Sequence, residues 1–168
     1  DNRLGCEELE EISTGEAIAG MVINGLGFSD SPMSLTPEFF EDKPLELLFR
    51  EGFKAEYLNR FKLGRSLDKV YEYGCDVLFS EIALEICQTE GVDMSCHHLD
   101  TTSFSVSGEY LPDEDEQAIK LTYGYSKDKR ADLKQAVLEM VVSNDGGVPF
   151  VSKSWNGNES DNKIFGAR

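Results

Sequence analysis

One short stretch, HHLDTTSFSV at residues 97–106, places both histidines of the chain beside an aspartate, in a run rich in β-branched and hydroxyl residues. On a β-strand His98 and Asp100 would share one face, whereas His97 would point to the other. A carboxylate buried in a strand is costly unless it is hydrogen-bonded, ion-paired or bound to a divalent cation. Asp100 is therefore either a metal ligand or a strand residue satisfied by neighbouring hydroxyl groups, and the residue types alone favour the second interpretation.

Other stretches also carry groups that could bind ions. The acidic run 113–116 lacks the ligand spacing and turn glycine of a calcium loop, so we expect a solvated loop. A basic stretch at 123–135 has two tyrosines and is either an exposed loop between strands or a contact for phosphates and bases. Its cations are Lys127, Lys129, Arg130 and Lys134.

The cysteines suggest no metal site. None of the four shows CxxC spacing, and three lie in or beside apolar runs, so the sequence predicts buried thiols rather than disulfides or a zinc site. Cys96 with His97, His98 and Asp100 would need consecutive strand residues to converge, which the alternation of side chains disfavours.

The charge balance restricts the classes of partner. The 168 residues hold 16 cations and 32 acids, a net charge of −16, and residues 1–100 carry 21 of the acids. Such a chain is unsuited to binding nucleic acid alone, because affinity for phosphate comes mainly from Lys and Arg. No apolar run has the length of a membrane span, so we expect a soluble, cytoplasmic protein.

The first 92 residues follow a helical pattern. Ser13 and Glu16 have the spacing of a capping box, and the apolar residues after them predict one packed face. That face comprises Ala17, Ile18, Met21, Val22 and Leu26. Later helical stripes contain Leu63, Leu67, Val70 and Tyr71, then Leu78, Phe79, Ile82, Ala83, Ile86 and Cys87. We interpret the pair around Gly74 as a packed helical hairpin rather than a DNA-binding helix-turn-helix.

After Gly91 the apolar period changes towards two, which predicts strands at 97–107, 118–126, 135–143 and 148–155. The SNDGGVP segment between the last two is typical of a β-hairpin turn. A helix is expected to start near Asp161. The predicted fold is therefore α+β, with a helical region at 1–92 and an antiparallel sheet within 93–168.

The ordered motifs LDTTSFSVSGEY, AIKLTYGYSKDKRADLKQ and DGGVPFVSKSWNGNESDNKIF closely resemble those of bacterial insertion-sequence transposases of the DDE class. Upstream, TGEAIAGMVINGLGF, LTPEFFEDKPLELLFREG and LGRSLDKVYEYG are similar to the helical N-terminal region of one branch of these enzymes. Nearly the whole chain takes part in the resemblance.

The resemblance implies an RNase H-like core in which two aspartates and a glutamate hold two Mg²⁺ or Mn²⁺ ions. Such ions activate water for strand cleavage and then the 3′-hydroxyl for strand transfer. Asp100 matches the first aspartate of the family. The implied partner is DNA, both transposon ends and target, and the full-length protein is expected to be a homodimer with no membrane association. The cations Lys127, Lys129, Arg130 and Lys134 become candidates for contact with the DNA backbone.

Asp161 departs from the family's second catalytic aspartate, because GNESD matches a segment that precedes a helix rather than the next strand. We interpret Asp161 as a helix-start or cleft-wall residue. The second aspartate and the glutamate are then expected beyond Arg168, so the chain is predicted to be an inactive N-terminal fragment. The alternatives are a non-catalytic helical-plus-β interaction module or degenerate transposon remnant, and another RNase H-like nuclease.

Overall fold

The computed structural model describes residues 1–5, 10–26, 32–110, 118–125 and 130–166, with only the main chain for Asp161, Asn162 and Phe165. It confirms the predicted α+β class: helices are followed by an antiparallel sheet. The chain divides into two compact units, Asp1–Gly74 and Cys75–Arg168. The boundary between the units does not coincide with the change from helix to strand, which falls between residues 90 and 97. The second unit begins with a helix that packs on the sheet.

The N-terminal unit contains short helices joined by tight connections. The capping box predicted for α1 is confirmed: the Glu16 amide donates to Ser13 Oγ at 3.0 Å, and the Ser13 amide donates to Glu16 Oε2 at 2.8 Å. The elements are α1 (Thr14–Asn24), the 3₁₀ turn η1 (Met33–Leu35), α2 (Thr36–Phe40), α3 (Leu45–Leu48), the 3₁₀ turn η2 (Ala55–Leu58) and α4 (Arg60–Tyr73).

Glu16 also ties α1 to a distant part of the same unit. Its second oxygen, Oε1, accepts a hydrogen bond from Arg50 Nε at 2.7 Å, and Arg50 Nη2 donates to the Glu11 carbonyl at 2.7 Å. Lys62, on α4, is almost completely buried and lies 2.7 Å from the Glu10 carboxylate. A cation buried this deeply is tolerated because it is paired.

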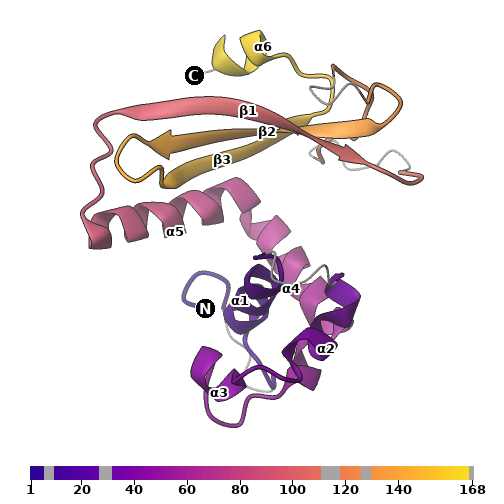
Figure 1. Cartoon of the computed structure of the whole chain (residues 1–168), viewed down its shortest axis with the longest axis vertical. Helices are drawn as coiled ribbons and strands as arrows, with labels where there is room; N and C mark the ends of the chain where they lie inside the picture. Colours follow the sequence, from indigo (N-terminus) through magenta and orange to yellow (C-terminus); the bar gives the residue numbers. More distant parts are fainter. Residues whose placement is uncertain (6–9, 27–31, 111–117, 126–129, 167–168) are drawn as a thin grey trace. The chain divides into compact units, whose positions relative to one another are not determined.

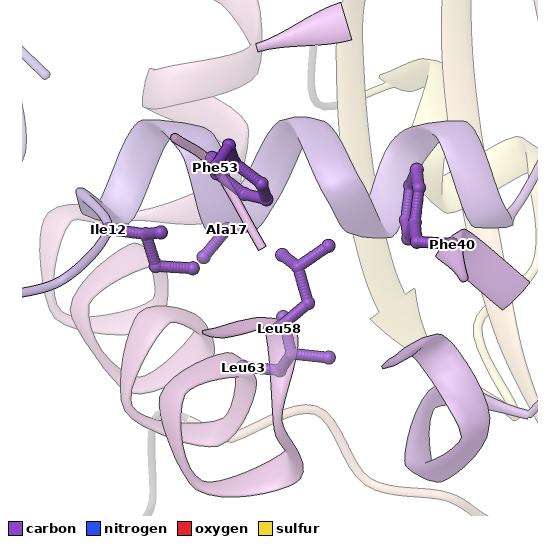
Figure 2. Close-up of a cluster of buried hydrophobic side chains, with 6 residues drawn as sticks. All are labelled: Ile12, Ala17, Phe40, Phe53, Leu58 and Leu63. Atoms are coloured by element: carbon purple, nitrogen blue, oxygen red, sulfur yellow. The ribbon is translucent and has the colours of Figure 1, made fainter. Parts of the chain in front are cut away.

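The core of this unit is a cluster of six buried apolar side chains, which converge from separate segments of the chain (Figure 2). Leu58 lies so close to α1 that a Cβ on Gly20 would approach its Cδ2 to 2.7 Å. This close approach needs a glycine and helps to fix which side of α1 faces the core. The cluster consists of Ile12, Ala17, Phe40, Phe53, Leu58 and Leu63.

The predicted apolar faces of the helices are partly wrong. In α1 the buried line passes through Ala17, Gly20 and Asn24, whereas Val22 and Leu26 are exposed. In α4 the residues Leu63 and Ser66 are buried, while Leu67 and Tyr71 are exposed. Small residues that allow close helix packing therefore displaced larger ones from the core side.

The second unit consists of α5 (Cys75–Glu90), β1 (His97–Val106), β2 (Lys134–Ser143), β3 (Pro149–Asn156) and α6 (Asp161–Gly166). The sheet has the order β1-β2-β3, with both pairs antiparallel. The predicted hairpin is confirmed, and Gly146 and Gly147 adopt φ of 72° and 63° in its turn. The strand predicted at 118–126 is wrong over residues 118–125, because Thr122 makes only an isolated bridge to Gln135 there.

Helix α5 runs alongside β3 (Figure 1). The sequence predicted that Ile82 and Ile86 belong to the apolar packing face of α5, but both are exposed. The buried residues of this helix are Leu78, Ala83 and Cys87.

The prediction of buried thiols is also only partly correct. Cys87 is buried, whereas Cys75 and Cys96 lie at the surface, and no disulfide links these three described cysteines. Cys6 lies outside the described residues. Of the helices in the described part of the chain, none combines the length and apolar character that crossing a lipid bilayer requires.

We expect the substitution Leu58→Ala to lower the free energy of unfolding of the N-terminal unit by about 3 kcal/mol, because it removes a fully buried side chain at the contact with Gly20. Denaturant titration followed by far-ultraviolet circular dichroism would measure the loss. Leu47→Ala is the matched control, since Leu47 is 87% exposed and its truncation should cost less than about 0.5 kcal/mol. Equal losses in both variants would contradict this assignment of the core.

Candidate active site

Asp100 is the fourth residue of β1 and lies on the exposed face of the sheet. Its Cα partner on β2 is Met140, whose partner on β3 is Ser152, so the residues directly across the sheet are uncharged. Asp100 Oδ1 accepts a hydrogen bond from the Thr101 amide at 2.8 Å. The carboxylate is thus accessible to solvent and satisfied in part by backbone, and its position requires neither a cation nor neighbouring hydroxyl groups for stability.

Lys134, the first residue of β2, lies on the same face of the sheet as Asp100. Asp100 pairs with Met140, and Lys134 is an even number of residues from Met140 along the strand. Met140 is six residues after Lys134 in β2, which corresponds to roughly 20 Å along the strand. Lys134 Nζ donates to the Tyr110 carbonyl at 2.7 Å. One face of the sheet therefore carries an accessible carboxylate, Asp100, and a cation, Lys134, at its far end.

Arg130 is held by a neighbouring acid. Its Nε and Nη2 donate to the two carboxylate oxygens of Asp132 at 2.9 and 2.8 Å. These hydrogen bonds lower the pKa of Asp132 and raise that of Arg130, so both groups stay charged at neutral pH. The positive charge of Arg130 is consequently offset by Asp132, while Lys127 and Lys129 lie outside the described residues.

The two histidines make ordinary contacts at the end of the sheet. His98 Nε2 lies 3.0 Å from Asn144 Oδ1, and the His97 ring packs edge-on against Phe150 with centroids 6.0 Å apart. Across the described residues, no three His, Cys, Asp or Glu side chains gather as a metal-binding group.

Glu139 is a buried acid that the sequence did not reveal as special. It lies in the middle of β2 with 0% exposure, and its Oε2 accepts a hydrogen bond from Trp155 Nε1 at 2.8 Å. Lys153, its Cα partner on β3, places Nζ 4.3 Å from the centroid of the Trp155 ring. Glu139 pairs with Thr101 rather than Asp100, so the two carboxylates project from opposite faces and cannot share a metal ion.

Three segments meet closely where β3 ends. Gln135 Nε2 donates to the Gly157 carbonyl at 2.7 Å and to the Tyr125 carbonyl at 3.2 Å, and the Gly157 amide donates to the Lys120 carbonyl at 3.1 Å. A Cβ on Gly157 would lie 2.0 Å from the Gln135 carbonyl oxygen, and one on Gly124 would lie 2.0 Å from the Gly157 carbonyl oxygen. We call this contact of Gly124, Gln135 and Gly157 the glycine junction.

The glycine junction sets where the chain leaves β3 for α6. The available sequence signal was Gly124 within one predicted strand and Gly157 just after another, because glycines in such places often mark a close approach of two backbones. The sequence alone did not indicate that the two would meet each other.

Asp161 is the first residue of α6, as expected for a helix starting near this position. The Ser160 carbonyl accepts hydrogen bonds from the Lys163 and Ile164 amides, and Ile164 is fully buried. The structure therefore places Asp161 at a helix start, and its side chain lies outside the described residues.

A groove of about 520 Å³ lies between α5 and β3. Val151, Lys153 and Trp155, which line it, share a sheet face with Glu139 and not with Asp100. The groove is therefore separate from Asp100, the candidate metal ligand, which projects from the other face of the sheet. Its other lining residues are Asp76, Val77, Ser80, Glu81, Leu84 and Ser152.

Comparison with known proteins gives one match. Residues 1–84 match the family described as "Domain of unknown function (DUF4277)", which is half of the chain. No curated protein and no solved structure matches.

We expect Gly157→Ala to destabilise the second unit by about 2–3 kcal/mol, because the added methyl group would meet backbone that cannot move aside. Trp155, the single tryptophan, lies in this unit, and its fluorescence during urea unfolding would measure the change. Gly166→Ala is the matched control, since a Cβ there meets open space in α6 and should be neutral or slightly stabilising. Tolerance of alanine at Gly157 would show that the glycine junction is not as tight as described.

Proposed function

The chain belongs to the DUF4277 family, a domain found in transposase-like proteins, and from this premise we propose that it acts in metal-dependent DNA strand cleavage and transfer at the ends of an insertion sequence. The observation that carries the proposal is the place of Asp100: an accessible carboxylate in the middle of the first strand of an antiparallel three-stranded sheet. This is where an RNase H-like core of the DDE class would have its first aspartate.

The proposed role of Asp100 is to supply one oxygen ligand to Mg²⁺ or Mn²⁺, both of which prefer carboxylate oxygens. Two ions held in fixed geometry need several such ligands, and among the described side chains only this carboxylate projects from its face of the three strands. The described residues by themselves therefore do not fit a two-metal centre. We derive no cleavage step from them and assign Asp100 the role of a single ligand.

The proposed DNA contact uses the same face of the sheet. Lys134 lies on it, and the basic segment that includes Lys127, Lys129 and Arg130 precedes β2 in the chain. A cation near the end of the sheet would meet the phosphate backbone of a duplex that passes over Asp100. Asp161, at the start of α6, keeps its proposed role as a helix-start or cleft-wall residue.

A second candidate function is a non-catalytic interaction module. The net charge of −16 and the pairing of Arg130 with Asp132 favour it, because both reduce the attraction of this chain for phosphate. The two candidates differ in whether Asp100 binds a divalent cation and in whether DNA binds at all.

Titration with MnCl₂, followed by nuclear magnetic resonance, tests the ligand role. We expect the amide signals of Leu99, Asp100 and Met140 to broaden at millimolar Mn²⁺, and we expect Asp100→Asn to abolish this broadening. Glu109→Gln is the matched control, since it removes an exposed carboxylate three residues after β1 and should leave the pattern unchanged. Broadening that survives in Asp100→Asn would contradict the proposed site and favour the interaction module.

Fluorescence anisotropy with a labelled duplex, at 50 mM salt, tests the DNA contact. We expect Lys134→Gln to weaken binding roughly threefold to fivefold through loss of one phosphate contact. Asp132→Asn should strengthen binding to a similar degree, because it removes a negative charge and releases Arg130 from its ion pair. Lys163→Gln, on α6, is the control for the loss of a cation elsewhere in the unit. Absence of DNA binding, or identical affinities for all four proteins, would contradict a DNA contact at this face.

A further inference from the structure

The groove between α5 and β3 follows an edge of the sheet. In the order β1-β2-β3 no strand of the described part of the chain lies beyond β3, so one side of β3 has no strand partner there. Val151, Lys153 and Trp155 project from one face of the sheet and Ser152 from the other, yet all four line the groove. A space lined from both faces of one strand reaches around its edge. We call this groove, with the outer side of β3, the β3 edge groove.

The pairing of the strands shows which backbone groups face the β3 edge groove. Gln135 of β2 exchanges both of its backbone hydrogen bonds with Thr122, at 3.0 and 3.3 Å, and therefore points them away from β1. The hydrogen-bonding direction alternates along a strand, so Glu139, four residues further on, turns its amide and carbonyl toward β3. Its Cα partner on β3 turns its own toward β2. The two neighbours of that partner, Ser152 and Ser154, consequently point their amides and carbonyls outward.

Helix α5, which runs alongside β3 (Figure 1), forms the opposite wall of the β3 edge groove. Val77 and Leu84 lie about two turns apart on one side of this helix and are 48% and 37% exposed, although both are apolar. On the strand, Trp155 supplies another apolar surface, and the hydrogen bond from its Nε1 to Glu139 fixes the indole. The volume of about 520 Å³ is in the range of ligand sites. The groove therefore has apolar surface on both walls.

The charged residues of the β3 edge groove favour a cationic partner. Asp76 and Glu81 place two carboxylates on the α5 wall, against one ammonium group, that of Lys153, among the described lining residues. The Lys153 Nζ lies 4.3 Å from the centroid of the Trp155 ring, so this cation already has an aromatic contact. A cationic side chain that enters the groove would gain a favourable interaction with either carboxylate.

We propose that the β3 edge groove binds an extended peptide segment of another protein, which adds to β3 as a fourth strand. The outward amides and carbonyls of Ser152 and Ser154 repeat at roughly 7 Å along the edge, a spacing that an extended chain matches and a helix does not. Alternate side chains of the peptide face α5, where apolar groups contact the exposed apolar residues of both walls. An arginine or lysine among them meets Asp76 or Glu81.

Other occupants fit the β3 edge groove less well. Nucleic acid would bring phosphates against the carboxylates of Asp76 and Glu81. A second copy, joined edge to edge by a two-fold axis perpendicular to the sheet, would bring both α5 helices to the same face with their carboxylates together. A peptide carries no such helix, and its backbone supplies hydrogen bonds whatever its side chains are. This inference concerns the edge of the sheet and does not depend on Asp100 or on the proposed DNA function.

A synthetic peptide of the same length as β3 tests the proposal with the full chain. In the probe, threonine alternates with valine, and arginine replaces the first and last valine. We expect a dissociation constant on the order of 100 μM, followed through the fluorescence of Trp155, the single tryptophan. In the saturated complex, hydrogen exchange at the Ser152 and Ser154 amides should slow at least about tenfold, because each amide gains a hydrogen bond.

Two pairs of variants separate the β3 edge groove from other surfaces. Ser152→Pro removes an outward amide and should weaken binding at least about tenfold, whereas Ser103→Pro makes the same change on the outer side of β1 and should leave binding within about twofold. Leu84→Lys places a cation among the apolar lining residues and should weaken binding to a similar degree. Ile86→Lys is its control, on a side of α5 that does not line the groove. Far-ultraviolet circular dichroism of each variant would show that the fold is retained.

Three results would overturn the proposal: no binding at about 1 mM peptide, binding that Ser152→Pro and Leu84→Lys leave intact, or unchanged exchange at Ser152 and Ser154 in the complex. Equal affinity for a peptide with glutamate in place of both arginines would overturn the preference for a cationic partner. Association of the chain with itself that Ser152→Pro abolishes would assign this edge to a second copy instead.

Discussion

The register of β1 on β2 is the constraint on which the candidate site depends. Successive side chains of a strand point to opposite faces, so a register with Thr101 opposite Glu139 necessarily places Asp100 opposite Met140. The first pair is buried and belongs to the face on which Trp155 contacts Glu139. A slip of β1 by one residue against β2 would turn Asp100 to the face of the sheet on which Glu139 is buried. The register of β1 on β2 therefore keeps Asp100 in solvent, on the face opposite to Glu139.

Much of the fold was predictable because local patterns specified it. The capping box at Ser13, the hairpin glycines Gly146 and Gly147, and the strand at 97–106 each arise from short-range chemistry. Which side of each helix faces the core was less predictable. Val22 and Leu67 looked like core residues by spacing, yet contacts around smaller residues turned them outward.

The features of the candidate site were likewise predictable only in part. Its strand, the alternation of His98 and Asp100 against His97, and a helix start near Asp161 followed from the sequence. The buried Glu139 and the glycine junction did not, because each depends on strands brought together from distant parts of the chain. Asp100 is exposed, so the cost of burying a carboxylate, from which the sequence argument for a metal ligand or hydroxyl partners began, does not arise.

Charge is the main physical difficulty for a DNA-related role, and the structure bears on it directly. Acids outnumber cations two to one, and the one described arginine of the basic stretch is paired with Asp132. The proposed phosphate binding at the sheet would therefore depend on a few local cations and on a divalent ion at Asp100, which would invert the local charge. A protein of this kind would be expected to bind DNA weakly at physiological salt and more strongly when the metal is present.

Anomalous scattering from manganese tests the role of Asp100 most directly. Crystals of the chain grown with a short DNA oligonucleotide and soaked in MnCl₂ should show an anomalous peak within about 2.5 Å of an Asp100 carboxylate oxygen. A phosphate oxygen of the DNA should complete part of the coordination, and the peak should be absent in Asp100→Asn crystals. Manganese bound at other carboxylates, with none at Asp100, would contradict the assignment of this strand as part of a DNA-cleaving site.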